Sequence, residues 1–574
     1  MAGPTPMAGA PGRPTPAGRL HGLMRWPLAL MRRPLGLMLA ASLWMATVGN
    51  WALWQELARL GALRGGAGVG LGVSLALMVT AGLLMLQSLL AWRWTLKPVL
   101  VVLLLATAAG THFMLAYRIV IDSTMLTNVL QTDVREAGDL FSLRLLATLG
   151  VMGVLPALLV WRLPLEHGRW TRRLGHNLLL LAAAVALLVA ATLASFQALS
   201  ATMRNHKHVR YLINPLNAVY ALGDLASQPL RRNTRVLLPL GTDAALGPRH
   251  AAAAAAGGKP PLLLLVVGET ARADHFALNG YGRPTNPALA ALPVVSWRNA
   301  WACGTSTAAS LPCMFSHLGR EGFADRKADH ENLLDVAQRA GLAVLWLDNQ
   351  AGCKGLCDRV PNASTTALQD PALCGEGECH DEILLQGLDE RLAALPAERR
   401  ARGVLLVMHQ MGSHGPAYFK RTPAARKPFG PECTSTALQD CDRAQLVNAY
   451  DNTIAYTDHV LARAIAWLQQ RSAVNDTALL YVSDHGESLG ENNLYLHGLP
   501  YALAPDAQKR VPWITWLSPG YAQRHGLEMA CLQARADAPV AHDHYFHSVL
   551  GLLDVRTSAY QPALDAYAAC RRGG

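Results

Sequence analysis

Acidic, imidazole and hydroxyl side chains follow several apolar runs in the second half of the chain. The set is Glu269 and Thr270, His409 and His414, and Asp484 and His485, with a hydroxyl-rich stretch at 304–310 between two cysteines. Carboxylates and a neutral imidazole are ligands that suit Zn²⁺. A hydroxyl beside such an ion loses its proton more readily, because the cation stabilises the alkoxide. If these residues meet at one place, they indicate phosphoryl or sulfuryl transfer through a covalent intermediate.

Alternating strand and helix patterns must position these side chains. Continuous apolar runs predict buried strands at 262–267, 341–348, 403–410, 478–484 and 511–518. Helices are predicted between them at 331–340, 381–395 and 444–470. This alternation indicates an α/β domain with a mostly parallel sheet. Ligands of such sheets gather beyond the carboxyl ends of the strands, where most of the chemical side chains are expected.

Five long and nearly uncharged windows occur in the first two hundred residues. They cover roughly 34–54, 68–92, 98–117, 144–161 and 177–198. Because about 20 apolar residues cross a bilayer as a helix, these windows predict five transmembrane helices. A soluble protein with buried helices is a poor explanation for five such windows in series.

Basic residues predict the orientation of these helices. The segment before the first window carries five arginines and no acid: Arg13, Arg19, Arg25, Arg32 and Arg33. The positive-inside bias therefore places the N-terminus in the cytoplasm and everything after about residue 200 outside it. The net charge of +11 follows partly from this topology, so it gives no reason to expect a nucleic acid partner.

All ten cysteines lie after residue 300, in the part predicted to be outside the cytoplasm. Their close spacing in an oxidising compartment predicts disulfides. The expected pairs are Cys303–Cys313, Cys353–Cys357, Cys374–Cys379 and Cys433–Cys441, with Cys531–Cys570 as a weaker fifth pair. A structural zinc site at 353/357 and 374/379 is an alternative, because those spacings fall near the zinc range.

Composition divides the chain into three parts. Residues 1–200 are the predicted transmembrane domain, 201–258 a bridging helix and linker, and 259–574 the external α/β domain. The linker is placed at the alanine- and glycine-rich stretch that ends at 258.

Five sequence blocks resemble the lipid A phosphoethanolamine transferases, a family that includes the mobile colistin-resistance proteins. The blocks are VVGETARADHFALNGYGRPTNP, CGTSTAASLPCMFS, MHQMGSHGPAYFKR, YDNTIAYTDHVL and SDHGESLGENNLYLHG. They stand in the family's order, and the resemblance covers essentially the whole chain. It implies five membrane helices in the bacterial inner membrane and a periplasmic catalytic domain of the alkaline phosphatase and sulfatase type.

The resemblance also implies roles for individual residues. By motif, Glu269, Asp484 and His485 would bind zinc together with Thr307, which would be the nucleophile. Spacing alone leaves Thr305 and Ser306 open as nucleophiles. Lys354, His414 and His497 match positions that bind the phosphoryl group or a second zinc ion.

One polar segment lies between the third and fourth windows. Asn128, Thr132 and Glu136 are spaced at i, i+4 and i+8, which predicts one face of a helix. A solvated helix face is the simple interpretation. The resemblance implies a contact with the ethanolamine head group of a lipid, whose ammonium Glu136 would pair.

The implied reaction uses phosphatidylethanolamine as donor and lipid A as acceptor, and the product would bind cationic polymyxins less well. Alternatives are a phosphoglycerol transferase, a transferase acting on core sugars, and a non-catalytic membrane sensor or transporter. Transporters usually have charged residues inside their membrane helices. The five windows are nearly free of them, so the sequence does not favour a transporter.

Overall fold

A computed structural model describes residues 31–132, 134–166, 168–231, 233–365, 368, 370–375 and 377–572. These residues form two compact units. The first contains the described residues before Phe113 together with Leu143–Asn217, and the second contains Phe113–Ser142 and the described residues from Ala218 onward. The segment between the third and fourth apolar windows therefore belongs to the same unit as the α/β domain.

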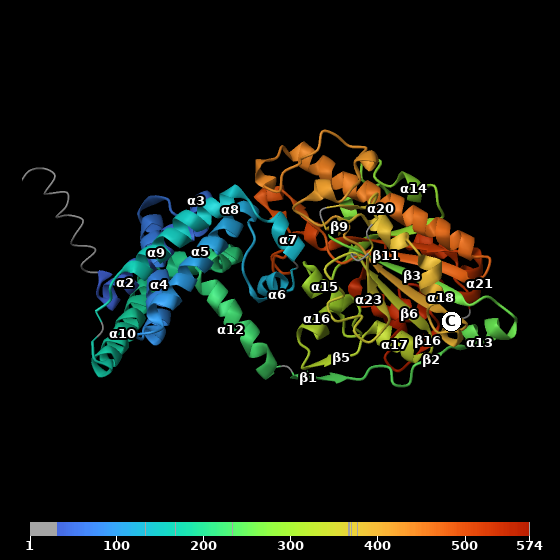
Figure 1. Ribbon diagram of the computed structural model, residues 1–574, viewed down its shortest axis with the longest axis horizontal. Helices are drawn as coiled ribbons and strands as arrows, with labels where there is room; N and C mark the ends of the chain where they lie inside the picture. Colours follow the sequence, from blue (N-terminus) through green and yellow to red (C-terminus); the bar gives the residue numbers. More distant parts are fainter. Residues whose placement is uncertain are drawn as a thin grey trace, which may run out of the picture. The chain divides into compact units, whose positions relative to one another are not determined.

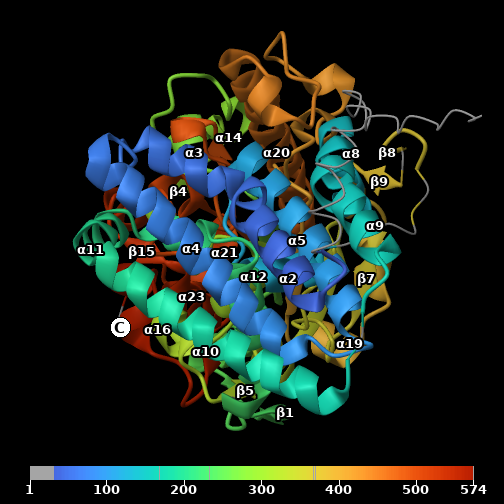
Figure 2. The same ribbon diagram turned by 90° about the vertical axis from the view of Figure 1, so that its left-hand side faces the viewer.

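Within the described residues, five helical segments are long and apolar enough to cross a membrane. They are Pro34–Arg59, α4 (Gly65–Leu90), α5 (Leu96–Tyr117), Leu143–Arg162 and α10 (Trp170–Ala194). α4 and α10 lie side by side (Figure 1, Figure 2). Leucines along α10, such as Leu178, Leu179 and Leu193, stay exposed, which suits a helix that faces lipid. The predicted transmembrane helices are confirmed, while Arg13, Arg19 and Arg25 lie outside the described residues.

An eight-stranded sheet forms the centre of the second unit, in the order β15-β4-β14-β11-β3-β10-β6-β7. The strands from β11 to β7 run parallel: β11 (Asp476–Ser483), β3 (Pro261–Gly268), β10 (Val404–His409), β6 (Ala343–Asp348) and β7 (Asn362–Ser364). β14 (Arg510–Leu517) is antiparallel to β11 and β4 (Val294–Trp301), and β15 (Val540–Ala541) runs parallel to β4. The mostly parallel sheet is confirmed.

Apolar side chains leave the sheet on both faces and form two cores. On β3, the odd-numbered residues from Leu263 face one core, and the even-numbered residues from Leu262 face the other. α17 (Leu333–Arg339) and α23 (His542–Leu552) cover the first face, and α20 (Arg443–Arg471) covers the second (Figure 1). Burial on both faces explains why these strands are continuous apolar runs.

Two predicted segments differ from expectation. The stretch 381–395 forms two short helices, Asp381–Leu385 and α18 (Leu388–Ala393), because Gly387 between them has a φ of +63°. Glycine adopts this left-handed conformation without steric cost. The alanine-rich stretch expected to be a linker is instead the helix α13 (Pro248–Ala255), in line with the high helix propensity of alanine.

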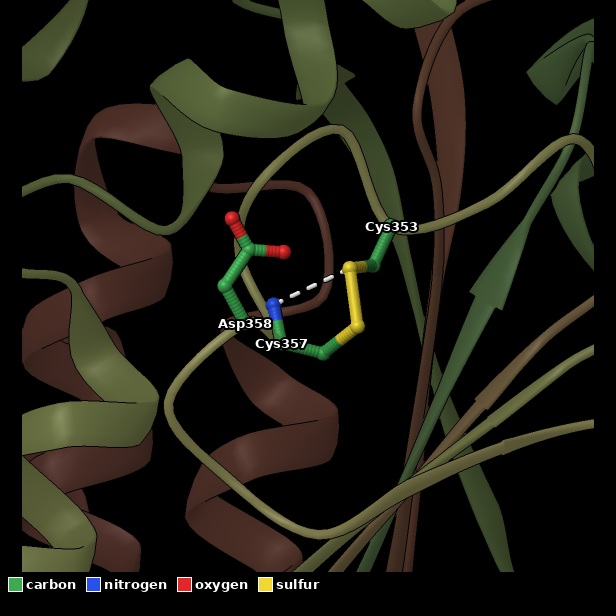
Figure 3. Close-up of side chains that lie close together, drawn as sticks. All are labelled: Cys353, Cys357 and Asp358. Atoms are coloured by element: carbon green, nitrogen blue, oxygen red, sulfur yellow. Dashed lines mark hydrogen bonds between the residues drawn. A yellow bond between two sulfur atoms is a disulfide. The ribbon is translucent and has the colours of Figure 1, made fainter.

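All ten cysteines form disulfides. The pairs are Cys303–Cys313, Cys353–Cys357, Cys374–Cys379, Cys433–Cys441 and Cys531–Cys570. Figure 3 shows the Cys353–Cys357 bond beside the carboxylate of Asp358. Because the four sulfur atoms of the alternative zinc site are bonded in pairs, they are not free thiolates, and that alternative is wrong.

Candidate metal centre and nucleophile

Two parallel strands deliver carboxylates to one edge of the sheet. β3 and β11 pair with Gly268 opposite Ser483, so the next residues, Glu269 and Asp484, leave the sheet side by side. Thr270 then has a φ of +59°, which is unfavourable for a β-branched residue. In this turn its N–H donates to Asp484 Oδ1 at 3.1 Å, and its hydroxyl donates to Glu269 Oε1 at 2.6 Å. The strained turn thus fixes both carboxylates.

Glu269, Asp484 and His485 form a buried group of possible metal ligands. One ligand atom from each lies within 4.8 Å of the others, and all three residues are 0% exposed. His485 Nε2 lies 3.4 Å from Glu269 Oε1 and 3.3 Å from Asp484 Oδ2. The other ring nitrogen, Nδ1, donates to the carbonyl of Gly486 at 2.9 Å, which leaves Nε2 available to a metal.

Burial and the charges of the neighbouring side chains shift the pKa values of Glu269, Asp484 and His485. Burial and the charge of Glu269 raise the pKa of Asp484. Burial acts to raise the pKa of Glu269, but the hydrogen bond and charge of His485 outweigh it and lower this pKa. Burial acts to lower the pKa of His485, yet Asp484 and Glu269 raise it to about 10.

The donor set fits a bound zinc ion. Asp484 Oδ2 is buried and has no hydrogen-bond partner among the described residues. A buried carboxylate oxygen is costly to leave without a hydrogen bond, and a cation held between this oxygen, Glu269 and His485 Nε2 would satisfy it. Two carboxylates and one imidazole are an ordinary set of Zn²⁺ ligands.

Thr307 is the hydroxyl residue that meets this group. It is the first residue of α15 (Thr307–Met314), and it is 3% exposed. Its Oγ1 lies 3.1 Å from Glu269 Oε2 and 3.4 Å from His485 Nε2. The start of α15 also adds partial positive charge beside Thr307, which favours an oxygen anion there.

The two neighbouring hydroxyls have different surroundings. Thr305 Oγ1 donates to the carbonyl of Leu499 at 2.6 Å. Ser306 Oγ is buried and has no hydrogen-bond partner in the described part of the chain. Of the three candidates, Thr307 is therefore the one with hydrogen bonds to the group of possible metal ligands.

Two further histidines and a glutamate extend the site. The ring centroid of His497 lies 4.3 Å from that of His485 and 5.8 Å from that of His414. Glu487 Oε1 lies 3.4 Å from His497 Nδ1, and Glu487 Oε2 accepts from the hydroxyl of Tyr418 at 3.0 Å. Glu487 is not among the residues predicted from the sequence, although it lies two positions after His485 in the same loop.

His409 ends β10 at the same sheet edge. Its Nδ1 lies 3.0 Å from Asp348 Oδ2, and its Nε2 has no hydrogen-bond partner among the described residues. Burial acts to lower the pKa of His409, but the charge of Asp348 outweighs it and raises this pKa. Asp348 thus holds the ring, as expected of a structural ion pair.

Lys354 lies at a helix end in the second unit. Its Nζ donates to the carbonyls of Gln131 and Ala351, both at 3.2 Å. Gln131 is the last residue of α6 (Ser123–Gln131), and α6 packs against α15. These hydrogen bonds place Lys354 at the end of α6 rather than on the possible metal ligands.

The three polar residues predicted to share a helix face do not do so. α6 ends at Gln131, Thr132 is extended with φ −69° and ψ 133°, and a second helix, α7 (Val134–Asp139), contains Glu136. The Thr132 hydroxyl donates to the carbonyl of Asn128 at 2.8 Å, a local bond that competes with helix continuation. The predicted stack on a single helix is therefore wrong, and the side chain of Glu136 lies outside the described residues.

Comparison with known proteins covers both units. Residues 261–555 match the sulfatase family, and residues 78–230 match the family described as phosphoethanolamine transferase EptA/EptB. The chain is 39% identical to phosphoethanolamine transferase EptA of Escherichia coli (strain K12) over 555 residues, which is 95% of this chain and 99% of the relative. It is 37% identical to phosphatidylethanolamine transferase Mcr-1 of Escherichia coli, covering 85% of this chain and 89% of the relative.

A solved full-length structure is also similar. The integral membrane protein lipooligosaccharide phosphoethanolamine transferase A (EptA) from Neisseria meningitidis superposes with a TM-score of 0.86 and 35% sequence identity. The superposition covers 93% of this chain and 98% of that chain. The likeness therefore includes the membrane helices as well as the α/β domain.

Proposed function

This chain belongs to the EptA family of phosphoethanolamine transferases, and we propose that it transfers phosphoethanolamine from phosphatidylethanolamine to a lipid A phosphate through a covalent intermediate on Thr307. The observation that carries this proposal is the position of Thr307 Oγ1, 3.1 Å from Glu269 Oε2 and 3.4 Å from His485 Nε2. A threonine hydroxyl is a weak nucleophile, and this group of ligands is where it would be activated.

In the first half-reaction, Thr307 Oγ1 attacks the phosphorus of the donor lipid. The Oγ1–P bond forms, and the bond from phosphorus to the diacylglycerol oxygen breaks. The hydroxyl proton moves toward Glu269, which Oγ1 faces, and the diacylglycerol oxygen gains a proton from His414 or His497. Diacylglycerol then leaves, and Thr307 carries phosphoethanolamine.

In the second half-reaction, an oxygen of a lipid A phosphate attacks the same phosphorus. The bond between phosphorus and Thr307 Oγ1 breaks, and Oγ1 takes back the proton that moved to Glu269. The histidine that protonated diacylglycerol regains its proton from the acceptor phosphate or from solvent. Transfer adds an amine to lipid A, so the modified lipid has more positive charge. Cationic polymyxins would bind it less well, which makes resistance to them the expected consequence in cells.

Glu269, Thr307, Asp484 and His485 would hold Zn²⁺. The bound ion supplies positive charge that lowers the pKa of the threonine hydroxyl and stabilises the developing charge on phosphoryl oxygens. His414 and His497 lie beside this site, so they would bind phosphoryl oxygens or contribute to a second zinc site together with Glu487.

The segment that follows the third membrane span would bind the donor head group. Asn128 and Thr132 lie at the end of α6, where Lys354 also bonds, and α6 packs against the helix of Thr307. Glu136 would pair the ethanolamine ammonium, and Lys354 would contact the phosphoryl group. The broken helix replaces the single face first expected, but the residues still come from one short segment.

The position in the membrane agrees with these substrates. The five apolar helices and the likeness to an integral membrane EptA indicate a multi-pass protein of the inner membrane. We place its catalytic domain in the periplasm because of the positive-inside bias. The likeness to the C-terminal periplasmic domain of EptC from Campylobacter jejuni supports this placement, since 59% of this chain matches that domain at 36% identity with a TM-score of 0.50. A tethered domain on that side meets both lipids in the same leaflet.

Mass spectrometry of lipid A tests the nucleophile. Cells expressing the natural chain should gain a phosphoethanolamine mass on lipid A, and cells expressing Thr307→Ala should not. Ser306→Ala is the matched control, since it removes a neighbouring buried hydroxyl that has no hydrogen bond to the metal ligands. A mass addition that survives in Thr307→Ala would remove Thr307 as nucleophile.

Labelled donors test the substrate. Purified protein should take label from phosphatidylethanolamine and not from phosphatidylglycerol. Label taken from phosphatidylglycerol alone would favour a phosphoglycerol transferase, and label from neither donor would favour a non-catalytic protein.

A further inference from the structure

A buried histidine that takes part in no step above joins the two elements of the catalytic site. His542 is the first residue of α23 and is 1% exposed. Its Nδ1 accepts from the backbone N–H of Cys303 at 3.1 Å, and its Nε2 donates to the carbonyl of Ser483 at 3.0 Å. Cys303 begins the loop that leads to Thr307, and Ser483 is the strand residue that precedes Asp484. One imidazole therefore bridges the nucleophile loop and the ligand strand.

The two backbone partners fix the state of this ring. A backbone N–H can only donate, so Nδ1 carries no proton. A carbonyl can only accept, so Nε2 carries the proton. His542 is thus a neutral imidazole in one tautomer, and a side chain without an acceptor and a donor at these two places cannot replace it.

Ser310 continues the same connection. It lies three positions after Thr307 on α15 and therefore on a neighbouring part of the same helix surface. Its hydroxyl donates to the carbonyl of Asp484, accepts from the N–H of Gly304 at 3.3 Å, and lies 3.2 Å from His542 Nδ1. Both side chains are buried, so water would not readily replace these hydrogen bonds if they were lost.

From these contacts we infer that His542 and Ser310 are positioning residues, which set the distance between Thr307 Oγ1 and the zinc ligands Asp484 and His485. The inference rests on the proposed roles of Thr307 and of those ligands. In the described part of the chain, the hydrogen bonds of His542 and Ser310 on the ligand side go to backbone carbonyls, those of Ser483 and Asp484, so they act on the backbone that carries the ligand atoms. A displacement of about 1 Å between reacting groups is enough to cost roughly 100-fold in rate.

The test compares His542→Ala and Ser310→Ala with the natural full-length chain in detergent. Each variant should bind zinc about 10- to 100-fold more weakly in competition with a chelator, as is common when groups that orient metal ligands are removed. Each should also lower kcat with little change in KM for phosphatidylethanolamine, because the hydrogen bonds of the two residues go to Cys303, Gly304, Ser483 and Asp484. Zinc affinity is read without turnover, so it reports positioning separately from activity.

His547→Ala is the matched control. His547 lies on the same helix, is 0% exposed, and accepts from the N–H of Gln561 at 3.1 Å, away from the catalytic loop. This variant should keep the zinc affinity and kcat of the natural chain.

Conservative variants separate the two contacts of His542. His542→Asn places an oxygen near the position of Nδ1, so it can still accept from Cys303 but cannot reach Ser483. His542→Gln places an amide N–H near the position of Nε2 and loses the bond to Cys303. Each should recover part of the zinc affinity that His542→Ala loses.

The outcomes are distinguishable. If His542→Ala and Ser310→Ala both match His547→Ala in zinc affinity and kcat, the positioning role is overturned. If His542→Ala does not fold, Ser310→Ala, which removes a single oxygen atom, decides the matter alone. Thr307→Ala tests the proposed function separately, because continued transfer by that variant would refute the nucleophile whatever the zinc affinities of the positioning variants.

Discussion

The two oxygens of Asp484 have different partners, and this allows a precise substitution. Oδ1 accepts from the N–H groups of Thr270 at 3.1 Å and His485 at 2.7 Å, whereas Oδ2 has no hydrogen-bond partner among the described residues. In Asp484→Asn, the side-chain oxygen can still accept from the N–H groups of Thr270 and His485. The amide nitrogen replaces Oδ2, the oxygen proposed to bind zinc. We expect the variant to fold, to lose bound zinc and to lose at least about 100-fold in transfer rate, measured by metal content and lipid mass spectrometry.

Glu491→Gln is the control for that prediction. Glu491 lies in the same loop, but its Oε1 pairs with Arg272 at 2.6 Å. It should therefore retain zinc. Stoichiometric zinc in Asp484→Asn would show that Asp484 is not a ligand.

His547 gives a pH dependence at a distance from the metal ligands. Burial, with help from the charges of His317 and His544, lowers the pKa of His547 to about 4. An unfolded histidine has a pKa near 6.5, so between pH 6.5 and 4 the unfolded chain binds more protons than the folded chain. The stability contributed by the neutral ring is complete above pH 6.5 and is lost as the pH falls to about 4.

His547→Gln should weaken this dependence, because glutamine does not titrate. The thermal unfolding midpoint of the natural chain should fall more steeply from pH 6.5 to 4 than that of the variant. Equal slopes for the two chains would show that His547 remains protonatable in the folded state.

The strand-end positions of Glu269, Asp484 and His485 were sufficient to predict that they meet, because strand ends in a parallel sheet share one edge. The choice of Thr307 came from the family resemblance, since spacing alone left Thr305 and Ser306 open. Glu487 and His542 were not proposed. Their importance follows from contacts with His497, Cys303 and Ser483, which only the packing of α23 and the loop after β11 creates.

At the scale of elements, α7 is attached to the loop after β10 by a buried ion pair with Arg421 and a partly exposed one with Lys420. Asp139, the last residue of α7, lies 3.1 Å from Lys420 Nζ and 2.8 Å from Arg421 Nη2. Arg421 Nε in turn donates to the carbonyl of His414 at 2.9 Å, and its Nη1 pairs with Glu378. Removing one partner of a buried pair typically costs about 3–5 kcal/mol.

Asp139→Asn should therefore loosen α7 and the loop that carries His414. Hydrogen–deuterium exchange should become faster in both segments. Asp537→Asn is the control, because its pair with Arg298 is exposed, and exposed pairs contribute little. Unchanged exchange near His414 would mean that Asp139 does not stabilise that loop.

Elements with uniform patterns were predictable, and interrupted ones were not. The five apolar runs became strands because both faces of the sheet are covered. β4 was missed because Arg298 and Asn299 interrupt its apolar pattern, which its pairing with β14 and β15 overrides. The breaks at Thr132 and Gly387 depend on single backbone conformations that periodicity does not report.

At the scale of the whole molecule, the disulfides differ in the length of chain that they close. Cys531 and Cys570 are 39 positions apart, whereas Cys353 and Cys357 are 4 apart. In the chain-entropy description, the longer loop gives about 4 kcal/mol of stability and the shorter about 2 kcal/mol. The double serine variant at 531 and 570 should therefore lower the thermal unfolding midpoint more than the variant at 353 and 357. The reverse order would show that strain or local packing outweighs loop length.

The residues Phe113–Ser142 belong to the compact unit of the catalytic residues, although the chain reaches them between its third and fourth membrane spans. A water-soluble fragment that begins after the last span would keep Glu269, Asp484, His485 and Thr307 but would lack α6, which packs against the helix of Thr307, and α7, which pairs with Lys420 and Arg421. Compounds selected against such a fragment would never encounter α6 or the attachment of α7. Inhibitor discovery against this enzyme therefore calls for the whole chain in a membrane mimic.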